Sequence, residues 1–152
     1  MERTESNVRL LMMAIDRIDE VYYRAQRASR MKDSLFVLMY ALSDGRPRSQ
    51  KQICAEWHIP RSTLNTVVLE QAHLGNVELV GSGHKEKYVS LTDKGAEFMR
   101  SSLAPLFEAE EHAERSVDVA DLAEQLDCFA VRLEAGLRVP ATQGENEMID
   151  RS

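Results

Sequence analysis

The hydrophobic periodicity of this chain changes once, after Gly75, and this change constrains the fold more than any other feature. Before Gly75 the apolar residues recur at helical spacing, whereas VELV (77–80) and YVSL (88–91) are short runs rich in β-branched and aromatic residues. A polar loop with two glycines separates the two runs, and this arrangement predicts a β-hairpin. We therefore expect a mainly α-helical protein with one small β-hairpin.

Two short helices are expected immediately before the hairpin. Ser49 is a favourable N-cap for the first, QKQICAEW, and the second, RSTLNTVVLEQAH, should end at Gly75. The preceding RPRS (46–49) should be a short extended link, because Pro47 cannot continue a helix. Helix, short turn, helix and hairpin together predict a winged helix-turn-helix, with the hairpin as the wing.

Longer helices are expected before this core. An apolar stripe that begins at Val8 predicts a first helix at 6–29. A second helix, apolar nearly all round and therefore buried, should have Asp33 or Ser34 as its N-cap and end before Gly45.

Two further helices are expected after the hairpin. Thr92 is a favourable N-cap for DKGAEFMRSSLAPLFEAEEHAE, in which Pro105 should kink or break the helix. Apolar residues at helical spacing mark a last helix between Leu122 and Leu137. Beyond Pro140 the periodicity stops, and we expect a disordered tail.

The net charge of −6 is unevenly distributed over the 152 residues. Residues 1–45 have a net charge of 0, residues 46–95 of +2 and residues 96–152 of −8. Because a nucleic acid responds to the local field of the docking face, an acidic chain whose middle segment is basic can still bind DNA.

The remaining composition points to the cytoplasm. There is no run of about 18 apolar residues, the length that a transmembrane helix requires, and the N-terminus has no signal-peptide pattern. The two cysteines, Cys54 and Cys128, are too few for a disulfide framework and fit a reducing compartment.

The second helix of the central pair has two chemically distinct faces. At 100° per residue one side should be buried, and it consists of Leu64, Val67, Val68 and Gln71. The other side, with Arg61 at its start, carries Ser62, Asn65, Thr66, Leu69 and His73. Small hydrogen-bonding side chains and an arginine are the groups that recognition helices present to base edges and phosphates in the major groove.

The two helices of the pair should be joined by apolar contacts. Cys54 supplies the small residue where they cross, and the apolar side chains expected to lock them together are Ile53, Trp57, Ile59 and Leu64.

These segments together resemble one known family. SQKQICAEWHIPRSTLNTVVLEQAHLG, the hairpin and YVSLTDKG are similar to the MarR family of bacterial transcriptional regulators. The most specific match is SLTxxG, with Ser90, Leu91, Thr92 and Gly95. The resemblance covers residues 6–138 and implies a homodimer whose recognition helices enter successive major grooves of a pseudo-palindromic operator.

The resemblance also divides the chain. It implies an N-terminal dimerisation helix at 6–30, a winged helix-turn-helix core at 31–95, C-terminal dimerisation helices at 96–138 and a tail at 139–152. Two features depart from the family pattern. The wing lacks the usual Asp-x-Arg element, and His58 occupies a turn position where glycine is common, which suggests a differently shaped turn.

The residues expected to contact DNA fall into three groups. On the recognition helix they are Arg61, Ser62, Asn65 and Thr66. In the wing they are His84, Lys85 and Lys87, which stand in for the missing arginine. At the flanking phosphate backbone they are Arg46, Arg48 and Lys51.

Other chemistry has weaker support in the sequence. Cys54 and His58 are spaced for a shared metal but lack further ligands, and residues 108–114 could hold a cation, although a charged run is usually a solvated face. A redox role is disfavoured, since Cys54 should be buried and Cys128 lies in an acidic, apolar helix. No catalytic motif is present, so we expect neither an enzyme nor a cofactor or metal site.

The partners expected are therefore double-stranded DNA and a second copy of the chain, with no membrane contact. The alternative is a dimeric winged-helix module that acts through protein contacts without tight DNA binding. A small-molecule effector is a further candidate partner, and five residues could line its cleft between the dimerisation helices and the core: Met12, Met13, Tyr22, Tyr23 and Met39. Each of these five fits an ordinary core position equally well.

Overall fold

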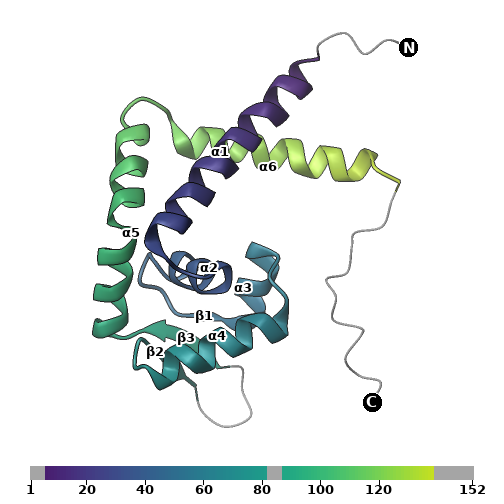
Figure 1. Cartoon of the computed structure of the whole chain (residues 1–152). Coiled ribbons are helices and arrows are strands. Elements are labelled where there is room, and N and C mark those ends of the chain that lie inside the picture. Colours follow the sequence, from purple (N-terminus) through teal and green to yellow (C-terminus); the bar gives the residue numbers. More distant parts are fainter. Residues whose placement is uncertain (1–5, 82–86, 139–152) are drawn as a thin grey trace.

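The computed structural model describes residues 6–81 and 87–138, which form six helices and three strands (Figure 1). In chain order these are α1 (Asn7–Ser29), α2 (Asp33–Ala41), β1 (Arg48–Ser49), α3 (Gln50–Trp57), α4 (Arg61–His73), β2 (Val77–Val80), β3 (Tyr88–Leu91), α5 (Asp93–Glu114) and α6 (Val119–Gly136). The mainly helical winged helix-turn-helix expected from the sequence is confirmed. The expected tail from residue 139 lies outside the described residues.

Side-chain caps fix the starts of the helices. Ser49 and Gln52 form a reciprocal capping box at the start of α3, and the Thr92 hydroxyl accepts from the backbone N–H of Gly95 at 3.0 Å at the start of α5. Both caps were expected. The start of α2 differs, because Lys32 is its N-cap and has no side-chain hydrogen bond there. Asp33 instead lies in the first turn, where its negative charge is favourable near the helix N-terminus.

Pro105 does not break α5, which is one helix from Asp93 to Glu114. Proline removes one hydrogen bond of the helical ladder. Leu103 and Leu106, on either side of it, are both buried, so tertiary packing holds the helix through this position.

The hairpin of β2 and β3 has the expected strand limits, and the register pairs Val77 with Leu91 and Val80 with Tyr88. The segment expected to be an extended link adds a third strand. β1 pairs antiparallel with β3, so the sheet order is β1-β3-β2. A strand of two residues is too short to show an alternating pattern in the sequence, which is why it was not predicted.

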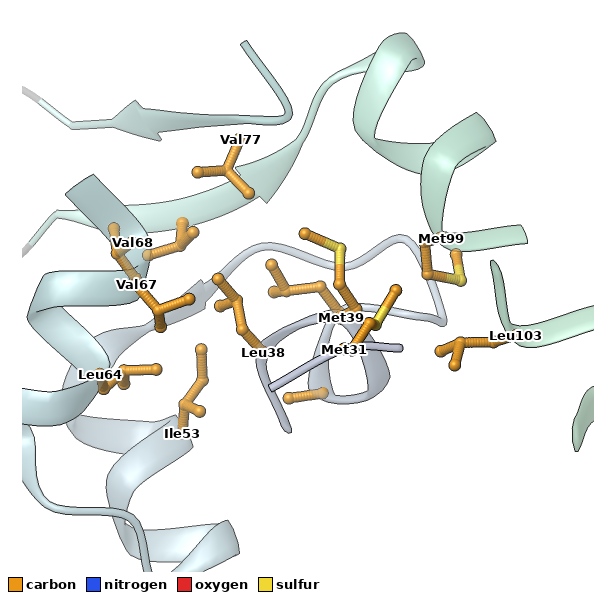
Figure 2. Packing of buried hydrophobic residues seen from close by; sticks show 13 residues of the cluster. Met31, Leu38, Met39, Ile53, Leu64, Val67, Val68, Val77, Met99 and Leu103 are labelled. Atoms are coloured by element: carbon orange, nitrogen blue, oxygen red, sulfur yellow. The ribbon is translucent and has the colours of Figure 1, made fainter. Parts of the chain in front are cut away.

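The main hydrophobic core lies inside the winged core and extends to α5. Figure 2 shows Leu38 of α2 with Ile53 of α3 and Leu64 of α4 on one side of it, and Met99 and Leu103 of α5 on the other. Leu38, Ile53 and Leu64 are completely buried. The expectation that α2 is buried is correct for Leu38, Met39 and Ala41. Asp33 is exposed, and the remaining residues of α2 are partly exposed.

Gly95 lets α5 begin against the turn that follows α4. A Cβ atom at this position would lie 1.8 Å from the backbone oxygen of Asn76, far inside van der Waals contact. The Thr92 backbone N–H donates to that same oxygen at 3.1 Å. The glycine of the SLTxxG motif is therefore required by close backbone packing.

In contrast to the core, α1 and α6 contain no buried residue within the described chain. Their exposed large apolar side chains are Val8, Leu10, Met12, Met13, Ile18, Val21 and Tyr23 in α1, and Val119, Leu122, Val131 and Leu133 in α6. In Figure 1, α6 lies at the opposite end of the molecule from α4. Over the residues that the structure describes, no helix has the length and hydropathy needed to span a bilayer.

Candidate nucleic-acid interface

The two faces of α4 are as the helical spacing predicted. Its inner face is buried and consists of Leu64, Val67, Val68 and Gln71. The opposite side, with Arg61, Ser62, Asn65 and Thr66, is exposed at every one of these positions. Because the inner face is fixed in the core, the polar face is held rigidly at the surface.

The turn between α3 and α4 has a left-handed residue at its centre. His58 has φ 50° and ψ 42°, a conformation that favours glycine. The prediction that histidine at this position gives the turn a different shape is therefore wrong, because His58 adopts the left-handed backbone that a glycine would adopt.

The contacts that join α3 to α4 differ from the prediction at one residue. Ile53 and Leu64 are buried, and Ile59 and Cys54 pack against the core from partly exposed positions. Trp57 is 41% exposed and packs edge-to-face on Tyr40 of α2, with ring centroids 5.3 Å apart. Its large ring extends toward α2 instead of into the helix pair.

Two hydrogen bonds define what the polar face of α4 can offer. The Thr66 hydroxyl donates to the backbone oxygen of Ser62 at 3.0 Å, which leaves the hydroxyl oxygen free to act only as an acceptor toward a ligand. The Gln50 side chain donates to Asn65 Oδ1 at 3.5 Å. Gln50 therefore belongs to this surface. Sequence patterns could not predict the contact, because 15 residues separate the pair.

Of the three cations expected at the flanking backbone, Arg48 is engaged within the protein. Its Nη1 and Nη2 donate to the two carboxylate oxygens of Asp44 at 2.6 and 2.7 Å, and Nη1 also donates to the Ala41 oxygen at 2.8 Å. The Arg48 hydrogen bonds hold the pKa of Asp44 well below its usual range. Arg46 and Lys51 are exposed.

Both strands of the wing are described, but residues 82–86 between them are not. Lys87 is exposed and directly precedes β3, beside the pair of Val80 and Tyr88, so it lies at the loop end of the hairpin. The other two wing candidates, His84 and Lys85, lie outside the described residues.

The cysteines and carboxylates show no reactive arrangement in the part of the chain that the structure describes. Burial raises the pKa of the Cys54 thiol, and the smaller opposing influence is the charge of Arg61. This disfavours the reactive thiolate. Cys128 is exposed. No three metal-ligating side chains come together within residues 6–81 and 87–138.

The five residues suggested for an effector cleft do not form one. Met39 is fully buried, whereas Met12, Met13 and Tyr23 are about half exposed and Tyr22 bonds to Glu110. A cavity of about 590 Å³ lies elsewhere, between the turn after α2, the end of β3 and α5. Its lining includes Asp44, Leu91, Met99, Arg100, Phe107 and Glu110. These five residues were wrongly grouped because helical spacing does not show which neighbouring helix a side chain faces.

Comparison with known proteins supports the fold. No protein-family model matches the chain, and no curated protein matches it. The solved structure of NMB1585, a MarR family regulator from Neisseria meningitidis, is similar with 25% identity and a TM-score of 0.68, over 87% of this chain and 96% of that one.

Two further structures agree in fold at lower identity. The MarR family transcriptional regulator SPO1453 from Silicibacter pomeroyi has 17% identity and a TM-score of 0.60, over 85% of this chain and 93% of its own. NadR in complex with 4-hydroxyphenylacetate has 14% identity and a TM-score of 0.59, over 83% and 95%.

Proposed function

The chain has the fold of the MarR family of transcriptional regulators, and from that premise we propose that it is a sequence-specific DNA-binding regulator, not an enzyme. It acts as a homodimer on a pseudo-palindromic operator and most simply represses by occupying it. The observation that carries the proposal is the α4 helix, whose one face is buried in the core while the other presents Arg61, Ser62, Asn65 and Thr66 to solvent.

Each residue of that face has a role that its chemistry allows. Arg61, at the first position of α4, pairs with guanine or phosphate, and Asn65 pairs with adenine through its amide. The Ser62 hydroxyl bonds a phosphate near the helix N-terminus. Thr66 directs its methyl group to a thymine methyl, because its hydroxyl hydrogen is used within the helix.

Cations beside this helix bind the phosphate backbone. Arg46 and Lys51 are exposed before and within α3, and Lys87 is exposed at the loop end of the wing, where we expect His84 and Lys85 to extend the same contact. We assign Arg48 a structural role instead, since Asp44 holds its guanidinium group at 2.6 and 2.7 Å.

The exposed apolar faces of α1 and α6 support the homodimer. An exposed apolar patch this extended is a common mark of a protein interface. A twofold axis through these helices would supply the second recognition helix that a pseudo-palindromic site requires. The cavity of about 590 Å³ beside α5 is large enough for a small-molecule effector.

Fluorescence anisotropy with DNA selected by the protein from a random library tests the proposal. The wild-type chain should bind the selected duplex far more tightly than a scrambled one, and affinity should fall as salt rises. Asn65→Ala should cost about 1–3 kcal/mol on the selected duplex and little on the scrambled one. Lys51→Ala, the control for phosphate contact, should weaken both alike.

Two outcomes would contradict parts of this proposal. Equal losses on both duplexes for Asn65→Ala would remove its base-reading role. No preference for any selected duplex would favour a winged-helix module that acts through protein contacts, to which the net charge of −8 over residues 96–152 is better suited.

A further inference from the structure

One carboxylate joins three helices at the boundary between the winged core and the flanking helices. The Tyr22 hydroxyl of α1 donates to Glu110 Oε1 at 2.7 Å, and the Tyr40 hydroxyl of α2 donates to the same oxygen at 2.5 Å. Glu110 itself lies near the end of α5. Hydrogen bonds to a charged acceptor are short and strong. We call these three residues the tyrosine–glutamate clamp.

Tyr40 is the centre of this contact. Its ring meets Tyr22 of α1 edge-to-face at 6.0 Å and Trp57 of α3 edge-to-face at 5.3 Å. It also stacks on Phe36 of its own helix at 5.9 Å and on Phe107 of α5 at 6.5 Å. One residue of the winged core therefore contacts α1, α5 and the first helix of the helix-turn-helix pair, α3.

The two tyrosines keep their protons at neutral pH. Burial raises the pKa of Tyr22 and of Tyr40, and the hydrogen bond to Glu110 adds to the effect in both. Both hydroxyls are thus permanent donors, and the Glu110 carboxylate has two of its hydrogen-bonding positions filled.

The position of the clamp along α5 lets it restrict the angle between α5 and the winged core. The start of α5 is fixed by Gly95 against Asn76, and Glu110 lies about 22 Å further along the helix. A tilt of about 10° at the fixed end would displace Glu110 by roughly 4 Å. A bond at this distant point therefore restricts the angle between α5 and the winged core more than any contact near the start.

We propose that the clamp is a positioning element, which fixes the angle between the flanking helices and the winged core and so sets the separation of the two recognition helices in the dimer. This inference rests on the proposed function. A dimer binds two half-sites only at the spacing that its recognition helices match. The clamp therefore determines half-site spacing although its residues lie away from the DNA-binding face.

The first test measures the angle without DNA. Trp57 is the only tryptophan and serves as the energy donor to a dye on a cysteine placed at Glu114, with Cys54→Ala and Cys128→Ser as background. The variants are Glu110→Gln and the double substitution Tyr22→Phe with Tyr40→Phe, which keeps both rings. The matched controls are their exposed neighbours, Glu111→Gln and Tyr23→Phe.

We expect the distance distribution from Trp57 to the dye to broaden in both clamp variants and to stay unchanged in both controls. The helical circular-dichroism signal should be the same in all five proteins. A distribution as narrow as that of the wild type in both clamp variants would overturn the proposal.

The second test uses the selected duplex and copies with one base pair added or removed between the half-sites. In the clamp variants, the ratio of the affinity for the selected spacing to the affinity for the altered spacings should fall by about tenfold, while the affinity for scrambled DNA stays the same. A general loss of stability would lower the affinity for all of these duplexes. If the wild-type chain binds no DNA but the distances change, the proposed function fails and the clamp's control of the angle stands. If it binds DNA and spacing discrimination is unaffected in the clamp variants, the positioning role fails alone.

Discussion

Gly95 shows how a single hydrogen in place of a methyl group can decide how two segments pack. Replacement by alanine would put a Cβ atom 1.8 Å from a backbone oxygen that is itself fixed by a hydrogen bond. We expect Gly95→Ala to lower the free energy of unfolding by about 3 kcal/mol, measured by urea titration. Gly136→Ala is the matched control, since nothing lies within 4 Å of its Cβ position, and it should be neutral or slightly stabilising.

At His58 we expect the opposite effect, a gain of stability on substitution. Its left-handed backbone, with φ 50°, costs a non-glycine residue about 1–2 kcal/mol, whereas glycine loses about 0.5–1 kcal/mol of chain entropy on folding. His58→Gly should therefore stabilise the protein by roughly 0.5 kcal/mol in thermal unfolding. Glu56→Gly, two residues earlier and inside α3, should instead destabilise it by about 1 kcal/mol. A loss of stability in both variants would show that the His58 side chain contributes contacts of its own.

At the scale of elements, the turn between α2 and β1 depends on the pair of Arg48 and Asp44. Because the pKa of Asp44 is depressed in the folded state, its contribution to stability is present above the unfolded pKa of about 3.9 and lost as pH falls toward the lower folded pKa. Asp44→Asn should remove this part of the acid sensitivity. Urea midpoints from pH 6 to pH 2 should fall less in Asp44→Asn than in the wild type, while Asp127→Asn, at an exposed site in α6, should follow the wild type.

The elements also show what local sequence can and cannot predict. The limits of α4, β2 and β3 followed from spacing and from Gly75, because those signals are local. β1 was not predicted, because a two-residue strand has no alternating pattern. The break expected in α5 at Pro105 does not occur, because tertiary packing outweighs one missing hydrogen bond. The bonds of Tyr22 and Tyr40 to Glu110 span 88 and 70 residues, so only the folded chain brings them together.

The same limit applies to the candidate site. The exposed face of α4 could be predicted because it depends only on which side of one helix is apolar. That Arg48 would be held by Asp44, and that Gln50 would reach Asn65, depends on the turns that bring those side chains together. Residue type therefore predicted which side of α4 is exposed, but it could not predict that Asp44 holds the Arg48 guanidinium group.

At the scale of the whole molecule, the exposed apolar seam of α6 should decide the oligomeric state. Leu133 is 55% exposed, and burying its side chain against a helix of a second copy is favourable. Burying a charged side chain at the same position without an opposite charge is costly. Light scattering after size exclusion should show a dimer for the wild type and a monomer for Leu133→Arg. Glu134→Arg, the next residue and also exposed, should remain a dimer. A wild-type monomer would contradict the dimeric arrangement outright.

In the folded chain the acidic and basic segments are separated in space. The acidic last third includes α6, which lies at the opposite end of the molecule from α4 and its basic surroundings (Figure 1). The protein is thus an electric dipole that a distant polyanion can rotate. In the field of a duplex, which extends about 10 Å at 0.1 M salt, the acidic end turns away before any atoms touch. On the proposed function, the molecule would then approach with α4 facing the duplex, and a larger fraction of its encounters would be productive.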